Sequence, residues 1–205
     1  MIAEYLTPHP KYQSLKITQM LVMLSVFLSM GQVSAEAITR EEAQTGLSIW
    51  EWREAGVSMQ LVQRLPDQTR AFFQGRGFTG EAADIIGRAC VFQTIFRNDG
   101  TEPITYDMDE WYLFFKGRDL PVQTRERWEK RWQVEGVSQA AMIAFRWSLL
   151  PTRQRFEPGD YNWGMTSFGL LPGETFDLTL SVTLNGNPVT GVIPGIVCAV
   201  DQPVK

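Results

Sequence analysis

Cationic and aromatic side chains are concentrated in one short stretch of this 205-residue chain. The stretch contains Arg125, Arg127, Trp128, Arg131 and Trp132. If residues 120–135 form an amphipathic helix, Trp128 and Trp132 lie on one face because they are four residues apart. Two indoles flanked by guanidinium groups can bind an acidic protein surface, a polyanion, a sugar polymer or a lipid headgroup. We therefore predict that this helix contacts a partner.

The same stretch also has a purely structural interpretation. Trp128 and Trp132 would then pack against the rest of the domain. Glu126 and Lys130, also four residues apart, would pair on the solvent side of the helix. The sequence alone leaves both interpretations open.

A second, weaker candidate lies between the Pro-Gly pairs at 158–159 and 172–173. Tyr161 and Trp163 occur there, and Trp163 precedes a glycine, an arrangement that suits a platform for a sugar or another small ligand. The alternative is that both rings fill a corner of the core. Asp107, Asp109 and Glu110 are also close together, but they lack the Asp-x-Asp-x-Asp-Gly spacing of a calcium loop, so we interpret them as a solvated turn.

An uncharged apolar run at 20–30 follows Lys11 and Lys16 and ends in the small-residue site Val33-Ser34-Ala35. This is the pattern of a secretory signal peptide, and we predict cleavage after Ala35. The run is shorter than the ~20 apolar residues that span a bilayer, so no stable membrane insertion is expected after cleavage. The alternative is an uncleaved signal anchor. The mature protein is expected to be periplasmic or secreted.

Removal of residues 1–35 takes away two lysines, Glu4 and the single histidine, His9. The remainder has 19 − 2 = 17 basic and 23 − 1 = 22 acidic residues, which is a net charge of −5. Without histidine, Ser-His-Asp and Cys-His catalysis and the common histidine-containing zinc and copper sites are excluded. We expect no enzyme activity, no cofactor and no metal site. The compartment and the negative charge also argue against a nucleic-acid partner.

The chain contains two cysteines, Cys90 and Cys198. An even number of cysteines in an exported protein predicts a disulfide between them. The alternative is a thiol pair that binds copper or undergoes redox chemistry, although the Cys-x-x-Cys spacing is absent. Copper(I) also accepts methionine sulfur, so a carrier of copper or of a small ligand is the alternative function.

These candidates are expected to sit on a single domain, residues 36–205, built mainly from short strands. Residues 36–46 form a charged lead-in, and a hairpin is predicted across 53–56. Helices are predicted at 66–75, 79–87 and 122–134. The segment 138–150 suits a helix or a strand, and alternation favours a strand from about Met142. Strands are predicted near 47–52, 57–65, 89–97, 104–106, 111–116, 175–184 and 189–200, with a hairpin turn at 185–187.

Seven to nine short strands with frequent turns predict an antiparallel β-sandwich with two or three short helical insertions, at about 66–88 and 120–135. Two segments, 91–106 and 171–178, resemble the immunoglobulin-like sandwiches of bacterial exported accessory proteins. The first has their strand, Asn-x-Gly, Glu-Pro, strand hairpin, and the second their late Pro-Gly-Glu strand entry. The resemblance implies a non-catalytic binding, assembly or accessory role. Our hypothesis is that the module docks onto another envelope protein or complex, with the helix at 120–135 as the favoured contact.

Overall fold

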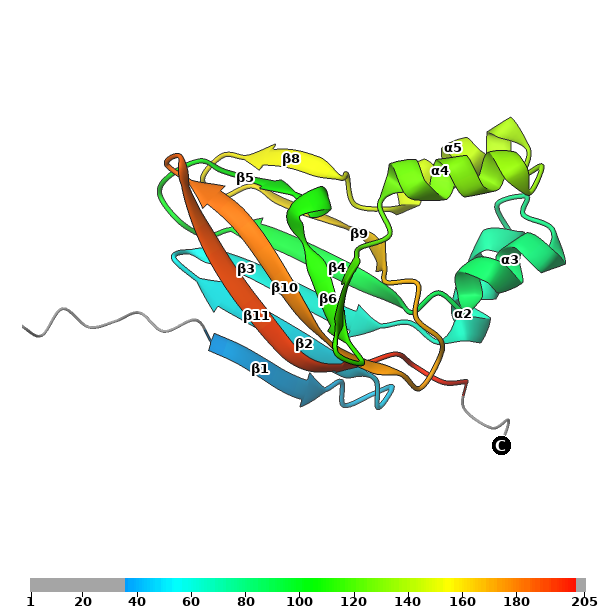
Figure 1. The fold of residues 1–205 in the computed structure, drawn as a ribbon, viewed down its shortest axis with the longest axis horizontal. Coiled ribbons are helices and arrows are strands. Elements are labelled where there is room, and N and C mark those ends of the chain that lie inside the picture. The colour runs from blue at the N-terminus through cyan, green and yellow to red at the C-terminus, as the bar shows by residue number, and fades with distance from the viewer. Residues whose placement is uncertain (1–35, 202–205) are drawn as a thin grey trace, which may run out of the picture. The chain divides into compact units, whose positions relative to one another are not determined.

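The structure is a computed structural model that describes residues 36–201 (Figure 1). The predicted signal peptide and its cleavage site after Ala35 lie outside the described residues. The elements follow in chain order: β1 (Glu36–Glu41), β2 (Ser48–Glu54), β3 (Val57–Gln63), α2 (Pro66–Gln74), α3 (Gly80–Gly87), β4 (Val91–Asn98), β5 (Ile104–Asp107), η1 (Met108–Glu110), β6 (Tyr112–Phe115), β7 (Arg118–Pro121), α4 (Arg125–Val134), α5 (Gln139–Ser148), β8 (Arg153–Phe156), β9 (Tyr161–Ser167), β10 (Thr175–Leu184) and β11 (Asn187–Val197).

The strands form two antiparallel sheets, which confirms the predicted sandwich with short helical insertions. The first sheet has the order β1-β2-β3-β4-β9. The second has the order β7-β6-β10-β5-β8, and β11 pairs with β10. Their inner faces share one core, in which aromatic rings from both sheets are in contact, such as Phe96 of β4 with Tyr106 of β5 at 4.9 Å between centroids.

Two predicted hairpins are confirmed. Ala55 and Gly56, which join β2 to β3, both have positive φ, 48° and 78°. Asn185 and Gly186, which join β10 to β11, have φ of 51° and 77°. Two consecutive positive φ angles define the turn whose twist matches that of paired strands.

The hairpin expected across the Asn-x-Gly and Glu-Pro residues is wrong. β4 pairs with β3 and β9, whereas β5 pairs with β10 and β8, so residues 99–103 carry the chain from one sheet to the other. Asn98 organises this crossing, because its side-chain amide donates to the carbonyl oxygens of Glu102, at 2.8 Å, and Phe156, at 3.3 Å. The Asn-x-Gly residues therefore form a turn without pairing the strands on either side.

The predicted pairing of the two cysteines is supported by geometry. The sulfur atoms of Cys90 and Cys198 lie 1.99 Å apart and the Cα atoms 5.0 Å apart. Both side chains are buried in the core between the sheets. Cys90 immediately precedes β4 of the first sheet and Cys198 immediately follows β11 of the second, so this bond links the two layers.

Helices α2, α3, α4 and α5 of the described residues gather at one end of the sandwich (Figure 1). They enclose a second core, separate from the first, that also includes Val91 of β4 and Met165 of β9. Its rings make edge-on and tilted contacts, among them Phe73 with Phe145 at 5.0 Å and Phe78 with Trp132 at 5.2 Å between centroids. The two predicted insertions, distant in sequence, thus form one helical layer. None of the helices between residues 36 and 201 is both long and apolar enough to cross a membrane.

Two sequence expectations about elements are wrong. Residues 139–148 form helix α5, not a strand from Met142. Ser138 caps this helix, since its hydroxyl accepts from the backbone N–H of Ala141 at 3.3 Å. The charged lead-in contains strand β1, which pairs with β2 through backbone hydrogen bonds that do not depend on polar side chains.

Candidate functional site

The two indoles predicted to contact a partner are buried. Trp128 is 2% exposed and Trp132 is 0% exposed, and their rings stack at 4.8 Å between centroids. The indole N–H of Trp128 donates to the Ser167 hydroxyl of β9 at 2.7 Å. The prediction that these two side chains form the contact surface is therefore corrected. Both side chains pack inside the domain, as the alternative interpretation expected.

Arg125 and Arg127 hold α4 to the chain around it. The guanidinium of Arg125 donates to the Leu149 carbonyl oxygen beyond α5. Burial, followed by the nearby charge of Arg146, lowers the pKa of Arg125. Arg127 donates to the Val122 carbonyl oxygen at 2.8 Å, and its guanidinium lies 3.7 Å from Asp109. Each of these two predicted contact residues therefore already has partners within the chain.

Arg131 differs from the other four predicted residues because its side chain is about half exposed. Its guanidinium carbon lies 5.7 Å from the centroid of Trp128, over the ring. It lines a hollow of about 310 Å³ where α3, α4 and the segment after β9 meet. We call this hollow the arginine hollow; its lining residues are Ile85, Arg88, Ala89, Gln123, Trp128, Arg131, Gly169 and Leu171.

The most exposed indole of the described part lies on α5, a helix that the sequence prediction missed. Trp147 is 81% exposed, and Ile143, one turn earlier on the same side of the helix, is about half exposed. Val134 at the end of α4 is also exposed. We call Ile143 and Trp147 of α5 the outer helical face. The four-residue spacing of Ile143 and Trp147 was the sequence signal that could have found it, once residues 139–148 were assigned to a helix.

Tyr161 and Trp163 lie side by side on the outer surface of β9, the edge strand of the first sheet. They are 59% and 64% exposed, so they do not fill a core corner. The guanidinium carbon of Arg97 sits 4.8 Å from the centroid of the Tyr161 ring. The structure brings these two predicted residues together at the surface, and their binding of a ligand stays a prediction.

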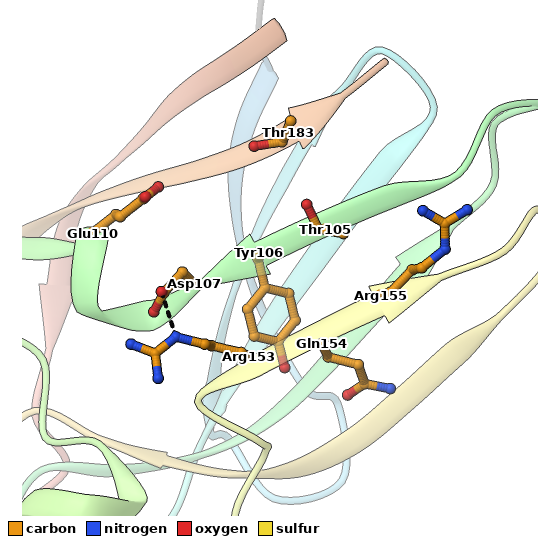
Figure 2. Close-up of a pocket in the computed structure, with 8 residues that line it drawn as sticks. All are labelled: Thr105, Tyr106, Asp107, Glu110, Arg153, Gln154, Arg155 and Thr183. Atoms are coloured by element: carbon orange, nitrogen blue, oxygen red, sulfur yellow. Dashed lines mark hydrogen bonds and ion pairs between the residues drawn. The ribbon is translucent and has the colours of Figure 1, made fainter. Parts of the chain in front are cut away.

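A further hollow, of about 440 Å³, lies on the outer face of the second sheet, where β5, β8 and β10 run together (Figure 2). Arg153 bridges two carboxylates there, with Nε 2.6 Å from Asp107 and Nη2 2.7 Å from Asp109. The hydrogen bond that Arg153 donates to Asp107, followed by the negative charge of Asp107, raises the pKa of Arg153. Asp107 and Asp109, which the sequence placed in a solvated turn, therefore neutralise an arginine. The surface is open and carries both signs of charge.

Comparison with protein-family models, curated proteins and solved structures finds no match. The resemblance to immunoglobulin-like accessory proteins therefore stays a prediction. Function has to be argued from the side chains that the fold presents at its surface.

Metal binding receives no support from the described residues. Between residues 36 and 201, no group of three or more histidine, cysteine or acidic side chains is arranged to hold an ion. Cys90 and Cys198 lie at disulfide-bonding distance, so neither offers a thiolate. The copper-carrier alternative thus loses both cysteine thiolates and stays a prediction that rests on methionine sulfur alone.

Proposed function

We propose that this protein is an exported, non-catalytic binding module that docks onto another protein of the cell envelope through its outer helical face. The observation that carries the proposal is the 81% exposure of Trp147 on a helix whose opposite side is packed. Exposed apolar side chains that cluster, rather than occurring singly, mark interaction surfaces. Tryptophan is also among the residues that contribute most to binding energy at protein interfaces.

The surroundings of the outer helical face resemble a protein interface in composition. A groove of about 190 Å³ runs between α4 and α5. It is lined by two apolar residues, Met142 and Ile143, and by the polar residues Glu129, Gln133, Gln139 and Arg146. Glu129 and Arg146 form an ion pair across it. A surface that combines apolar side chains with amides and a neutralised charge pair is typical of interfaces between proteins.

The outer helical face also rests on a rigid base, which reduces the entropy lost on binding. Phe145 lies between Ile143 and Trp147 in sequence but is fully buried in the second core. The connection to α4 is fixed as well: Gly136 has a φ of 68°, and the N–H of Val137 donates to the Trp132 carbonyl oxygen at 3.0 Å. This is the helix ending that glycine permits at low cost.

Export is part of the proposal and is supported by the predicted signal at 20–35 and by the cysteine pair. A disulfide of this kind persists in oxidising compartments outside the cytosol. The absence of histidine from residue 36 onward supports a non-catalytic role, since it removes the commonest general base.

The test uses site-specific photo-crosslinking in the native host. A photo-reactive side chain replaces Gln139, which lines the groove between α4 and α5. We expect one crosslinked protein of defined mass, and we expect Trp147→Ser to abolish it. The matched control is Phe114→Ser, because Phe114 is also an exposed aromatic residue but lies on β6 of the second sheet. Thermal unfolding of both variants checks that the fold is intact.

Four results would overturn the proposal. A crosslink that survives Trp147→Ser, or no crosslink at all, removes the outer helical face as the contact. A product of twice the chain mass shows a second copy of this chain in place of an envelope protein. Binding to anionic lipid vesicles that depends on Trp147, without a protein crosslink, assigns the surface to the membrane.

A further inference from the structure

The arginine hollow differs in charge from the other two hollows described above. The hollow on the second sheet is lined by both acidic and basic side chains, and the groove between α4 and α5 contains an ion pair. The arginine hollow is lined by Arg88 and Arg131 and by no acidic side chain. Its charge therefore suits an anion.

Both guanidinium groups are held in place from outside the hollow. Arg88 pairs with Asp84 one turn earlier, at 2.7 Å, and the guanidinium of Arg131 lies 3.9 Å from Glu135 one turn later. Arg131 also lies over the ring of Trp128. An arginine has five N–H donors, so one acidic neighbour leaves donors for a ligand. Because each arginine already shares its charge, a singly charged ligand fits better than a doubly charged phosphate.

The remaining walls of the arginine hollow contain apolar groups beside the amide of Gln123. Ile85, Ala89 and Leu171 contribute aliphatic groups. Trp128 is 2% exposed and adds little surface to the hollow, although its hydrogen bond to Ser167 fixes the ring beneath Arg131. A volume of about 310 Å³ lies at the small end of the range for ligand sites, ~300–1,000 Å³. The hollow thus combines two cationic groups with an apolar surface, and it has room for a group of about the size of one side chain.

We propose that the arginine hollow binds a carboxylate carried by an apolar group of about the size of a leucine or phenylalanine side chain. The carboxylate accepts from Arg88 and Arg131, and the apolar group packs on Ile85 and Leu171. Such a carboxylate occurs at the C-terminus of a peptide and in a free organic acid. This site is separate from the outer helical face and does not depend on the proposed docking function.

The test measures binding of small probes to the purified exported protein by calorimetry and by amide chemical shifts. We expect N-acetyl-leucine to bind saturably and N-acetyl-leucinamide, which lacks the charge, to bind at least about tenfold more weakly. Arg88→Gln and Arg131→Gln are each expected to weaken binding of the acid about tenfold. The matched control, Arg97→Gln, removes an arginine that stacks on Tyr161 and does not line the hollow, and is expected to change nothing.

Two further probes separate the sources of the carboxylate. A short peptide that ends in leucine binds more tightly than octanoate if the site recognises a C-terminus, and more weakly if it recognises a free acid. Equal binding of N-acetyl-leucine and its amide overturns the proposal, as does no binding at millimolar concentration. Tighter binding of inorganic phosphate than of N-acetyl-leucine overturns the ligand class. Binding that Arg88→Gln and Arg131→Gln both leave unchanged places the ligand elsewhere.

Discussion

Helices α4 and α5 are equal in length and adjacent in sequence, yet they differ in where their large apolar side chains lie. Helix α4 buries its pair, whereas α5 exposes its pair to solvent. Each has ten residues, and each carries large apolar residues four apart. On α4 these are Trp128 and Trp132, which are buried and stacked. On α5 they are Ile143 and Trp147, which face solvent, while Phe145 is buried.

The difference shows that an apolar stripe does not by itself identify the buried side of a helix. The indoles of α4 have aromatic partners inside the second core, since Trp132 contacts Phe78 at 5.2 Å and Phe145 at 5.3 Å between centroids. Phe145 takes the inward position on α5, and residues two positions before and after it necessarily point away. The surface left over on α5 is therefore both apolar and exposed, which is why we place docking there and not on α4.

The largest expected effect comes from truncating the indole on the buried side. Trp132→Ala should lower the free energy of unfolding by about 4 kcal/mol, because it removes a fully buried ring and leaves a cavity. The matched control, Trp147→Ala, should cost no more than about 0.5 kcal/mol. Denaturant unfolding measures both. Equal losses for the two variants would contradict the contrast between α4 and α5.

Removing the disulfide between the two sheets should have the next largest effect on the free energy of unfolding. Replacing Cys90 and Cys198 by serine should lower the free energy of unfolding by about 3 kcal/mol, since the bond closes a loop across a sequence separation of 108 residues. Denaturant unfolding with and without reductant measures this loss, and a thiol assay of the unfolded wild type should find no free thiol. The prediction would be contradicted if the wild type contained two free thiols and its free energy of unfolding did not change with reductant. The disulfide lies in the core between the sheets and not in the helical layer. Tryptophan emission should therefore be recorded as well, to compare the unfolding of the helical layer with that of the sandwich.

Much of the sandwich could be predicted from the sequence because its signals are local. Turns with two positive φ angles, alternating strands and an N-capped helix depend on a few neighbouring residues, as at Asn185-Gly186 and Thr79. Sheet partners are not local. The segment 98–103 has the composition of a hairpin turn, but Asn98 is bonded to Phe156, far along the chain, and β5 joins the other sheet.

The error at α5 has a different physical cause. Ile143, Phe145 and Trp147 alternate out, in, out, as residues do on a strand. On a helix, positions two apart lie about 200° from each other and positions four apart lie on the same side, so five residues give the same alternation in both structures. The same ambiguity between helix and strand affected the prediction of the candidate site. Arg131 was predicted from composition and lies at a hollow, whereas Trp147 was missed because its helix was assigned to a strand.

A smaller effect is expected at the start of α5. Ser138→Ala should lower the free energy of unfolding by about 1 kcal/mol, because the N–H of Ala141 loses the side-chain acceptor that caps the helix. Ser138→Asp keeps an acceptor at the same position and should restore most of the loss. Denaturant unfolding measures both variants. Equal losses for alanine and aspartate would argue against the cap and hence against the helix boundary that exposes Trp147.

Glu126, in the first turn of α4, should give the smallest effect. Its carboxylate accepts from the hydroxyl of Thr152, in the segment that follows α5. Burial by itself raises the pKa of Glu126, but the hydrogen bonds to the carboxylate and the charges of Arg146 and Arg153 outweigh it and hold the pKa below its ordinary value of 4.5. A lowered pKa in the folded state stabilises the protein above the ordinary value, and this contribution is lost as the pH falls through the lowered pKa.

Glu126→Gln should therefore cost about 0.5 kcal/mol at neutral pH, a small figure because solvent screens the partly exposed carboxylate. The difference in free energy of unfolding between wild type and variant should shrink as the pH falls from 4.5 through the lowered pKa. Denaturant unfolding across this acid range measures the difference, and the control is Glu135→Gln at the far end of α4, where the carboxylate lies 3.9 Å from Arg131. A difference that persists in acid would assign the contribution of Glu126 to its packing and not to its charge. In that case side-chain packing, and not charge, holds the start of α4 against the segment after α5, as it holds the two stacked indoles together.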